Sequence, residues 1–138
     1  MQWDAHEDIE ENHHRMAAQT DQPVAALIKD LKQRGLLDET LVIWGGEFGR
    51  SPEAQGGRGR DHHNLGFSMW LAGGGIKGGQ VYGATDKIAA YPSDKPVSPE
   101  DYLATIYHAM GLDPQSEMID KENRPHRLVD GVPVMGLF

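Results

Sequence analysis

Apolar residues recur with helical spacing in the first third of the chain. The spacing is i, i+3, i+4, i+7, carried by Val24, Leu27, Ile28 and Leu31. This stripe predicts an amphipathic helix over residues 20–34. Thr20 or Asp21 can cap its start, and Pro23 is tolerated in a first turn, where its missing N–H costs nothing. Gly35 is expected to end the helix in a left-handed conformation.

A second helix is predicted over residues 98–110. Ser98 precedes Pro99 and two acidic residues, which is a favourable helix start. Gly111 is expected to stop the helix. The predicted buried stripe consists of Leu103, Ile106, Tyr107 and Met110.

Two short apolar runs predict strands. Residues 41–44 are apolar without alternation, which is typical of a strand covered on both faces in a parallel sheet. Residues 67–72 form the second run. A terminal hairpin is predicted over residues 128–134, turning at Asp130-Gly131. Because helices and strands alternate, we expect an α/β fold with a mostly parallel sheet. Two or three strands are too few for a free-standing parallel sheet, so the chain is expected to form part of a larger one.

Composition excludes several classes of function. The 138 residues include 13 Lys and Arg against 21 Asp and Glu, a formal net charge of -8. This balance argues against nucleic acid as the main partner. The sequence contains no run of 18 apolar residues, so no membrane span is predicted. Its start lacks a basic stretch followed by an apolar one, so no signal peptide is predicted there. The absence of cysteine excludes disulfides and thiolate metal sites.

Histidine and glycine are unevenly distributed. Thirteen of the 17 glycines lie between Gly45 and Gly83. Five of the seven histidines form two short clusters, which are His6, His13 and His14, and His62 and His63. Imidazoles and carboxylates beside flexible backbone indicate a site. The pair at residues 13–14 is interpreted as a surface pair.

The segment after the first predicted strand carries candidate chemistry. In open α/β sheets, ligands gather beyond the carboxyl ends of the strands. Glu47 lies three residues past the strand among glycines, so it is a candidate metal ligand or acid–base group. Arg50 is a candidate oxyanion-binding group. The alternative is a glycine-rich turn whose Glu47 and Arg50 pair on the surface.

Two further segments carry metal-ligating residue types. Asp61, His62 and His63 are adjacent and offer the donors that zinc or manganese takes, although one imidazole is expected to point elsewhere. Asp4 and His6 are two residues apart, so in an extended segment both face one side. For residues 61–63, the alternative is a solvated polar loop, and an Asp-x-His triplet is a weak signal by itself.

Two other patterns are interpreted as non-functional. Residues 73–78 match G-x-G-x-x-G, but no helix pattern follows to bind a pyrophosphate. Arg124, His126 and Arg127 could meet an anion, but a polar tail is the preferred interpretation.

Several motifs in order resemble one bacterial family, the domain of unknown function 1501, within the alkaline phosphatase and sulfatase superfamily. The motifs are Trp-Asp-x-His at residues 3–6, Leu-Lys-x-Arg-Gly-Leu-Leu-Asp at 31–38, Gly-Glu-Phe-Gly-Arg at 46–50, Gly-Arg-Asp-His at 59–62, and Leu-Ala-Gly-Gly-Gly-Ile-Lys-Gly-Gly at 71–79. The resemblance covers almost the whole chain. It implies an alkaline phosphatase-like α/β/α sandwich in which Asp and His from separate loops bind one or two divalent cations, and a nucleophile attacks a phosphate or sulfate ester.

The resemblance also implies roles for residues. The metal ligands would be Asp4, His6, Glu47, Asp61 and His62, with His63 as the substitute if the register differs by one. The cation would be zinc, or else calcium, manganese or magnesium, and Arg50 would bind the oxyanion. Relatives usually carry Asp-His or Asp-Asn where this chain has Glu47-Phe48, which leaves the metal number open.

The family is longer than this chain, and its N-terminal part supplies the nucleophile. Residues 1–138 are therefore expected to be the C-terminal part of one domain, with the N-terminal half as a partner. Relatives are usually exported. We expect a segment of a metal-dependent hydrolase of small-molecule or carbohydrate phosphate or sulfate esters, inactive alone. The alternative is a non-catalytic metal-binding or assembly module of the same fold.

Overall fold

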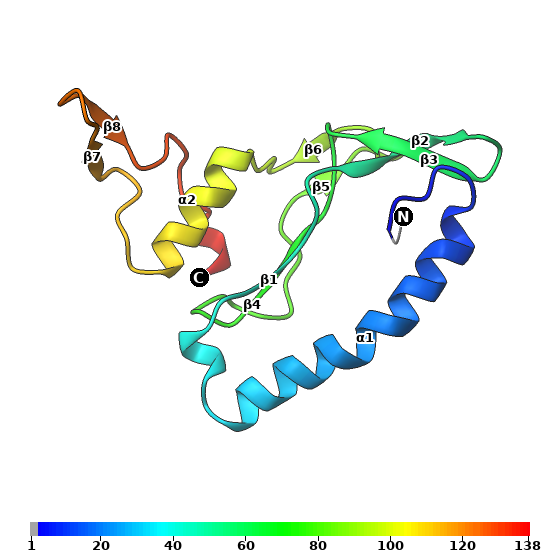
Figure 1. Ribbon diagram of the computed structural model, residues 1–138, viewed down its shortest axis with the longest axis horizontal. Helices are drawn as coiled ribbons and strands as arrows, with labels where there is room; N and C mark the ends of the chain where they lie inside the picture. The colour runs from blue at the N-terminus through cyan, green and yellow to red at the C-terminus, as the bar shows by residue number, and fades with distance from the viewer. Residues whose placement is uncertain (1–2) are drawn as a thin grey trace.

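The computed structural model describes residues 3–138 and combines helices with short strands (Figure 1). The helices are α1 (Ile9–Gln33) and α2 (Pro99–Ala109), with short 3-10 turns η1 (Leu37–Glu39) and η2 (Met135–Leu137). The strands are β1 (Val42–Trp44), β2 (Gly49–Gln55), β3 (Gly59–His63), β4 (Trp70–Ala72), β5 (Ala84–Thr85), β6 (Pro92–Asp94), β7 (Glu117–Ile119) and β8 (Pro125–Arg127).

Helix α1 begins 11 residues before the predicted start at Thr20. The side chain of Asp8 caps it by accepting the backbone N–H of Glu11, and acidic residues fill the first turn. Pro23 therefore lies inside the helix, where a proline costs about 3 kcal/mol. The predicted end is confirmed, because Arg34 is the C-cap and Gly35 adopts a φ of 69°.

The expected mostly parallel sheet is wrong for the described residues. Strands pair in four antiparallel couples, β1 with β4, β2 with β3, β5 with β6, and β7 with β8. The chain returns from β1 to β4 through the β2–β3 hairpin, whereas a parallel return needs a crossover connection, usually a helix. Residues 3–138 accordingly do not form the expected three-layer sandwich, and only the mixed α/β character holds.

The β1–β4 ribbon runs between the two helices (Figure 1). Trp44 and Trp70 are directly opposite each other, with parallel rings whose centroids are 6.2 Å apart. Such cross-strand aromatic pairs stabilise a ladder. Both rings remain more than a third exposed, as does Ile43, so the ribbon is not covered on both faces as its sequence predicted.

Helix α2 begins as predicted, since Ser98 accepts the backbone N–H of Asp101. Its predicted buried stripe is wrong at two positions, because Leu103 and Met110 are exposed and the buried side chains are Ala104 and Thr105. The C-terminal segment hydrogen-bonds to this side of the helix, through Asp101 and Thr105.

The contacts between α2 and the C-terminal segment also overturn the predicted hairpin over residues 128–134. Asp101 accepts the backbone N–H of Val132, and the Thr105 hydroxyl accepts that of Val134. Gly131 lies against the backbone of Glu100, where a Cβ would collide. The segment therefore packs along the helix and does not pair with itself.

Little apolar surface is buried in the described part of the chain. Its buried apolar side chains are Ala5, Met16, Ala90, Ala104, Val129 and Val134. The chain exposes 9907 Å² of accessible surface, whereas a compact monomer of 15.2 kDa exposes about 7100 Å². In the predicted apolar stripe of α1, Leu27 is 49% exposed, and Val24, Ile28 and Leu31 are only partly buried.

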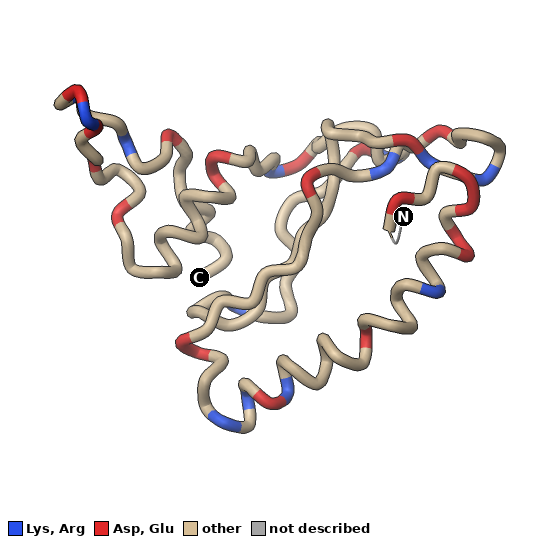
Figure 2. Tube along the Cα trace, in the orientation of Figure 1, with Lys and Arg blue, Asp and Glu red and all other residues tan. Residues whose placement is uncertain are grey.

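Charges are distributed over the whole trace (Figure 2). Acidic residues gather at the start of α1, and lysines and arginines are spread over separate elements. No helix among the described residues has the length and apolar character needed to cross a membrane.

The hairpin of β7 and β8 forms in the region predicted to be a polar tail. Asp120 organises its turn by accepting the backbone N–H groups of Glu122 and Arg124, and the side chains of Arg124 and His126. These hydrogen bonds, above all that from the Arg124 backbone, lower the pKa of Asp120 from 3.8 to about 2. Arg124 and His126 are thus bound to a carboxylate of the chain itself.

Replacing Asp120 should disorder this hairpin. Because the folded pKa is depressed, the ionised carboxylate stabilises the turn above about pH 4 and loses this effect as the pH falls towards 2. In Asp120→Ala, we expect faster amide exchange of Arg124 at pH 7 and no further loss of hairpin order between pH 4 and 2. Asp21→Ala, at an exposed position of α1, is the control. Unchanged exchange in Asp120→Ala contradicts this account.

Candidate metal site

The N-terminal segment lies along strand β3 near the start of α1 (Figure 1). The backbone N–H of Arg60 donates to Ala5 O at 3.2 Å, and that of Ile9 donates to Arg58 O at 3.3 Å. Gly59 lies between these two bonds, and a Cβ there would collide with the backbone of His6. The absence of a side chain at this position lets the two backbones meet.

This packing brings together one carboxylate and two imidazoles from distant parts of the sequence. Asp4 Oδ1 lies 2.9 Å from His6 Nε2 and 2.9 Å from His62 Nε2. The two Nε2 atoms are 3.1 Å apart. We call these three residues the Asp4–His6–His62 cluster.

The cluster has the donor set and the spacing of a metal site. Nitrogen and oxygen ligands about 2.05 Å from a tetrahedral zinc ion lie roughly 3.3 Å from one another. The three separations of 2.9–3.1 Å are close to that value. The residues therefore fit the divalent metal that the family resemblance implied.

Arg50 bonds to the same carboxylate oxygen of Asp4 as the two imidazoles. Its Nη2 donates to Asp4 Oδ1 at 2.9 Å and to Trp3 O at 3.3 Å, and its Nη1 donates to Arg60 O at 3.3 Å. Hydrogen bonds from His62 and Arg50 lower the pKa of Asp4 from 3.8 to about 2. Asp4 is thus held as a carboxylate, the form that binds metal.

Two residues that the sequence did not single out orient the imidazoles. Gln55 Oε1 accepts the Nδ1–H of His6 at 2.6 Å. The ring of Phe48 stacks on His62 with centroids 4.0 Å apart. Phe48 belongs to the motif at residues 46–50, but its apolar ring is not a metal-ligating type, and Gln55 lies outside the motifs.

The register of β2 and β3 explains these placements. Arg50 is paired with His62, and Gln55 with Gly59. The pairing shifts between Arg50 and Ala54, a stretch that contains Pro52, which has no N–H for a ladder. Residues at both ends of β2, Arg50 and Gln55, contact the cluster on either side of this irregularity.

The other predicted ligands are not part of the cluster. His63 points away from it, as alternation along a strand requires, and its Nε2 lies 2.6 Å from Ala90 O. Asp61 Oδ1 is 3.7 Å from His6 Nδ1, on the opposite edge of the ring from the cluster. Glu47 is exposed in the loop after β1. Among residues 3–138, the side chains that converge as possible metal ligands are Asp4, His6 and His62, without Glu47.

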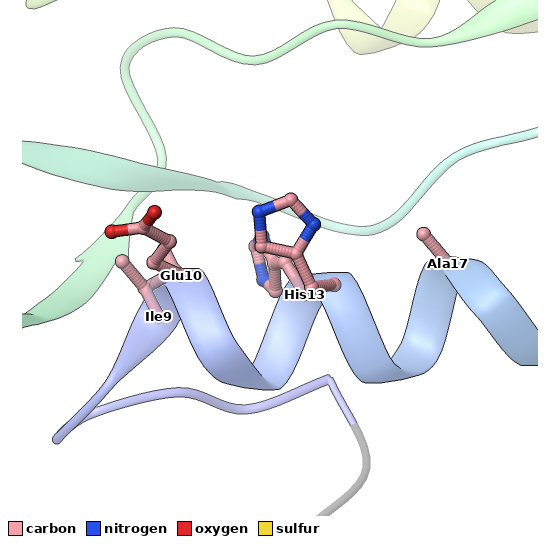
Figure 3. Close-up of a pocket in the computed structure, with 5 residues that line it drawn as sticks. Ile9, Glu10, His13 and Ala17 are labelled. Atoms are coloured by element: carbon pink, nitrogen blue, oxygen red, sulfur yellow. The ribbon is translucent and has the colours of Figure 1, made fainter.

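A separate hollow lies along the first turns of α1 (Figure 3). Glu10, His13 and Ala17 share this face of the helix. The ring of His13 lies against Trp3, with centroids 5.5 Å apart. His13 therefore packs beside the segment that carries Asp4, but it is not part of the Asp4–His6–His62 cluster.

Gly59→Ala tests whether the close backbone approach assembles the cluster. The added Cβ forces the N-terminal segment away from β3, and overpacking of this kind costs about 1–3 kcal/mol. We expect lower thermal stability and displaced His6 signals in NMR spectra. Gly78→Ala is the matched control, because a Cβ there meets nothing within 4 Å. Equal behaviour of the two variants would falsify this account.

Comparison with known proteins gives one match. The model of a family described as "Protein of unknown function (DUF1501)" matches residues 1–137. No match was found among curated proteins or among solved structures. Since the match spans nearly the whole chain, this protein belongs to the DUF1501 family.

Proposed function

We propose that this chain is the metal-binding segment of a sulfatase-like hydrolase of phosphate or sulfate esters. The observation that carries the proposal is the convergence of Asp4, His6 and His62, whose ligand atoms all lie within 4.8 Å of one another. The order of sequence motifs, which resembles that of the alkaline phosphatase and sulfatase superfamily, supports the reaction class.

The donor set favours zinc. Two imidazole nitrogens with one carboxylate oxygen suit zinc, whereas calcium and magnesium prefer oxygen ligands. With three protein ligands, a fourth position stays open, as in catalytic zinc sites. When bound, the metal would polarise the ester oxygen and stabilise the charge that develops in the transition state.

The chain itself would bind and orient the anionic ester. Arg50 has five N–H donors, of which three are used by Asp4, Trp3 and Arg60. The remaining donors, one on Nε and one on Nη1, can face an oxyanion beside the cluster. We propose that Arg50 both holds Asp4 and binds the ester oxygen.

The exposed surface supports the proposal that these residues are part of a larger domain. The excess over a compact monomer is about 2800 Å². That excess is as large as the surface lost in obligate protein interfaces. Further polypeptide covering the β1–β4 ribbon and the apolar stripe of α1 would account for it, and it would also supply a nucleophile.

A second candidate function is a metal-binding module without catalysis. The observation that favours it is the side-chain chemistry around the cluster. Among residues 3–138, the side chains that bond to Asp4, His6 and His62 belong to one another, Arg50 and Gln55, none of which is a hydroxyl nucleophile. Metal binding without hydrolysis, even when the rest of the domain is present, identifies this module.

Zinc binding tests the shared basis of both functions. We expect the purified chain to retain zinc after dialysis, measured by elemental analysis, and to bind it in competition with a chelator. His6→Ala and His62→Ala should weaken binding roughly 100-fold or more, beyond the effect of losing an outer-sphere partner. A wild-type chain without zinc contradicts the proposal.

His63→Ala is the matched control for His62→Ala. The two residues are adjacent in β3, but His63 is directed to Ala90 O. Its replacement should leave the zinc affinity within about threefold of the wild-type value, well below the 10–100-fold change caused by loss of even an outer-sphere partner. A larger loss assigns His63 to the site and rejects the ligand set proposed here.

The chain alone is expected to be inactive. Because no nucleophile bonds to the cluster in the described residues, zinc-loaded protein should hydrolyse 4-nitrophenyl phosphate and sulfate no faster than zinc in buffer. Release of 4-nitrophenolate measures this directly. Robust turnover that is lost in His62→Ala would show that the chain carries a complete active site.

A further inference from the structure

The side-chain amide of Gln55 contacts the imidazole of His6. Gln55 lies at the end of β2, before the Gly56-Gly57 turn, and its Oε1 is 2.6 Å from His6 Nδ1. The opposite ring nitrogen of His6, Nε2, is the one directed to Asp4 and His62. Gln55 and the metal-binding atom of His6 therefore lie at the two ends of one imidazole.

An amide oxygen can only accept a hydrogen bond, so this contact requires a proton on Nδ1 of His6. In a neutral imidazole, the other nitrogen then carries a lone pair. That lone pair is on Nε2 and is aimed into the cluster. Metal-ligating histidines are commonly held in this way, with the second nitrogen donating to a fixed acceptor.

Asp61 is the other acceptor near Nδ1, at 3.7 Å, which is beyond hydrogen-bond distance. Its carboxylate accepts the backbone N–H of His62 at 2.8 Å instead. The neutral amide of Gln55 therefore holds the His6 ring, whereas the Asp61 carboxylate hydrogen-bonds to the backbone of β3.

The backbone geometry places Gln55 where it can do this. Gln55 is paired with Gly59 across the hairpin, and Gly59 is the residue against which the backbone of His6 packs. The same close approach that brings His6 to β3 therefore brings its ring to the Gln55 amide.

We propose that Gln55 is the positioning residue that sets the tautomer of His6 and thereby the metal affinity of the Asp4–His6–His62 cluster. The inference rests on the proposed metal-binding function. Gln55 acts through His6 and does not touch the metal. In this account, the β2–β3 hairpin supplies both a ligand, His62, and the outer-sphere partner of a ligand from another segment.

The experiment compares Gln55→Leu, which removes the acceptor, with Gln55→Glu, which keeps an oxygen at the same position. In the metal-free wild type, long-range ¹H–¹⁵N NMR spectra should show His6 as the Nδ1–H tautomer, and Gln55→Leu should lose this preference. The zinc dissociation constant should rise about 10–100-fold in Gln55→Leu, and Gln55→Glu should restore tight binding. Gln22→Leu, at an exposed position of α1, is the matched control.

The outcomes separate this inference from the function on which it rests. A wild-type chain that binds no zinc overturns both. If the wild type binds zinc and Gln55→Leu keeps its affinity, only the role of Gln55 is overturned. A weaker Gln55→Leu that retains the Nδ1–H tautomer also overturns it, because a merely structural role lowers stability without changing the ring's proton.

Discussion

The packing of the N-terminal segment against strand β3 is the interaction on which the site depends. It consists of two backbone hydrogen bonds and a close approach between the backbones of His6 and Gly59, which a side chain at position 59 would prevent. Without it, Asp4 and His6 have no fixed relation to His62, which is 56 or more positions away along the chain. Arg50 strengthens the same junction by bonding to Trp3, Asp4 and Arg60 together. One junction thus both fixes the N-terminal segment and assembles the Asp4–His6–His62 cluster.

The site is well organised within a chain that buries little apolar surface. Polar groups hold the cluster in place, and the buried apolar side chains of the described residues are mostly small. The two tryptophans of the β1–β4 ribbon remain more than a third exposed, and Leu27 of the α1 stripe is half exposed. These observations are consistent with a local metal-binding unit whose large apolar faces are covered by further polypeptide, which is the arrangement that we propose.

The elements that sequence reasoning located correctly have local causes. The start of α2 follows from the capping hydroxyl of Ser98, and the end of α1 from the left-handed conformation of Gly35. The errors have local as well as tertiary causes. The cap at Asp8 and the turn at Asp120 are local, whereas the bonding of residues 132–134 to α2 is tertiary. The start of α1 lies before Pro23 because Asp8 caps the helix where the hairpin contacts it, through the ion pair with Arg58. The C-terminal hairpin formed at Asp120, whose carboxylate binds four donors, and not at Asp130-Gly131.

The sequence by itself determined the residue types of the site, the clustering of imidazole and carboxylate, and the family. It also predicted that one of the adjacent imidazoles points elsewhere, and the structure shows that this is His63, since side chains alternate along β3. Only the tertiary structure decided which candidates meet. Asp4, His6 and His62 converge, whereas Glu47 and His63 do not join them. The difference arises because long-range convergence depends on strand register, on the irregularity at Pro52 and on backbone contact at Gly59, none of which residue spacing encodes.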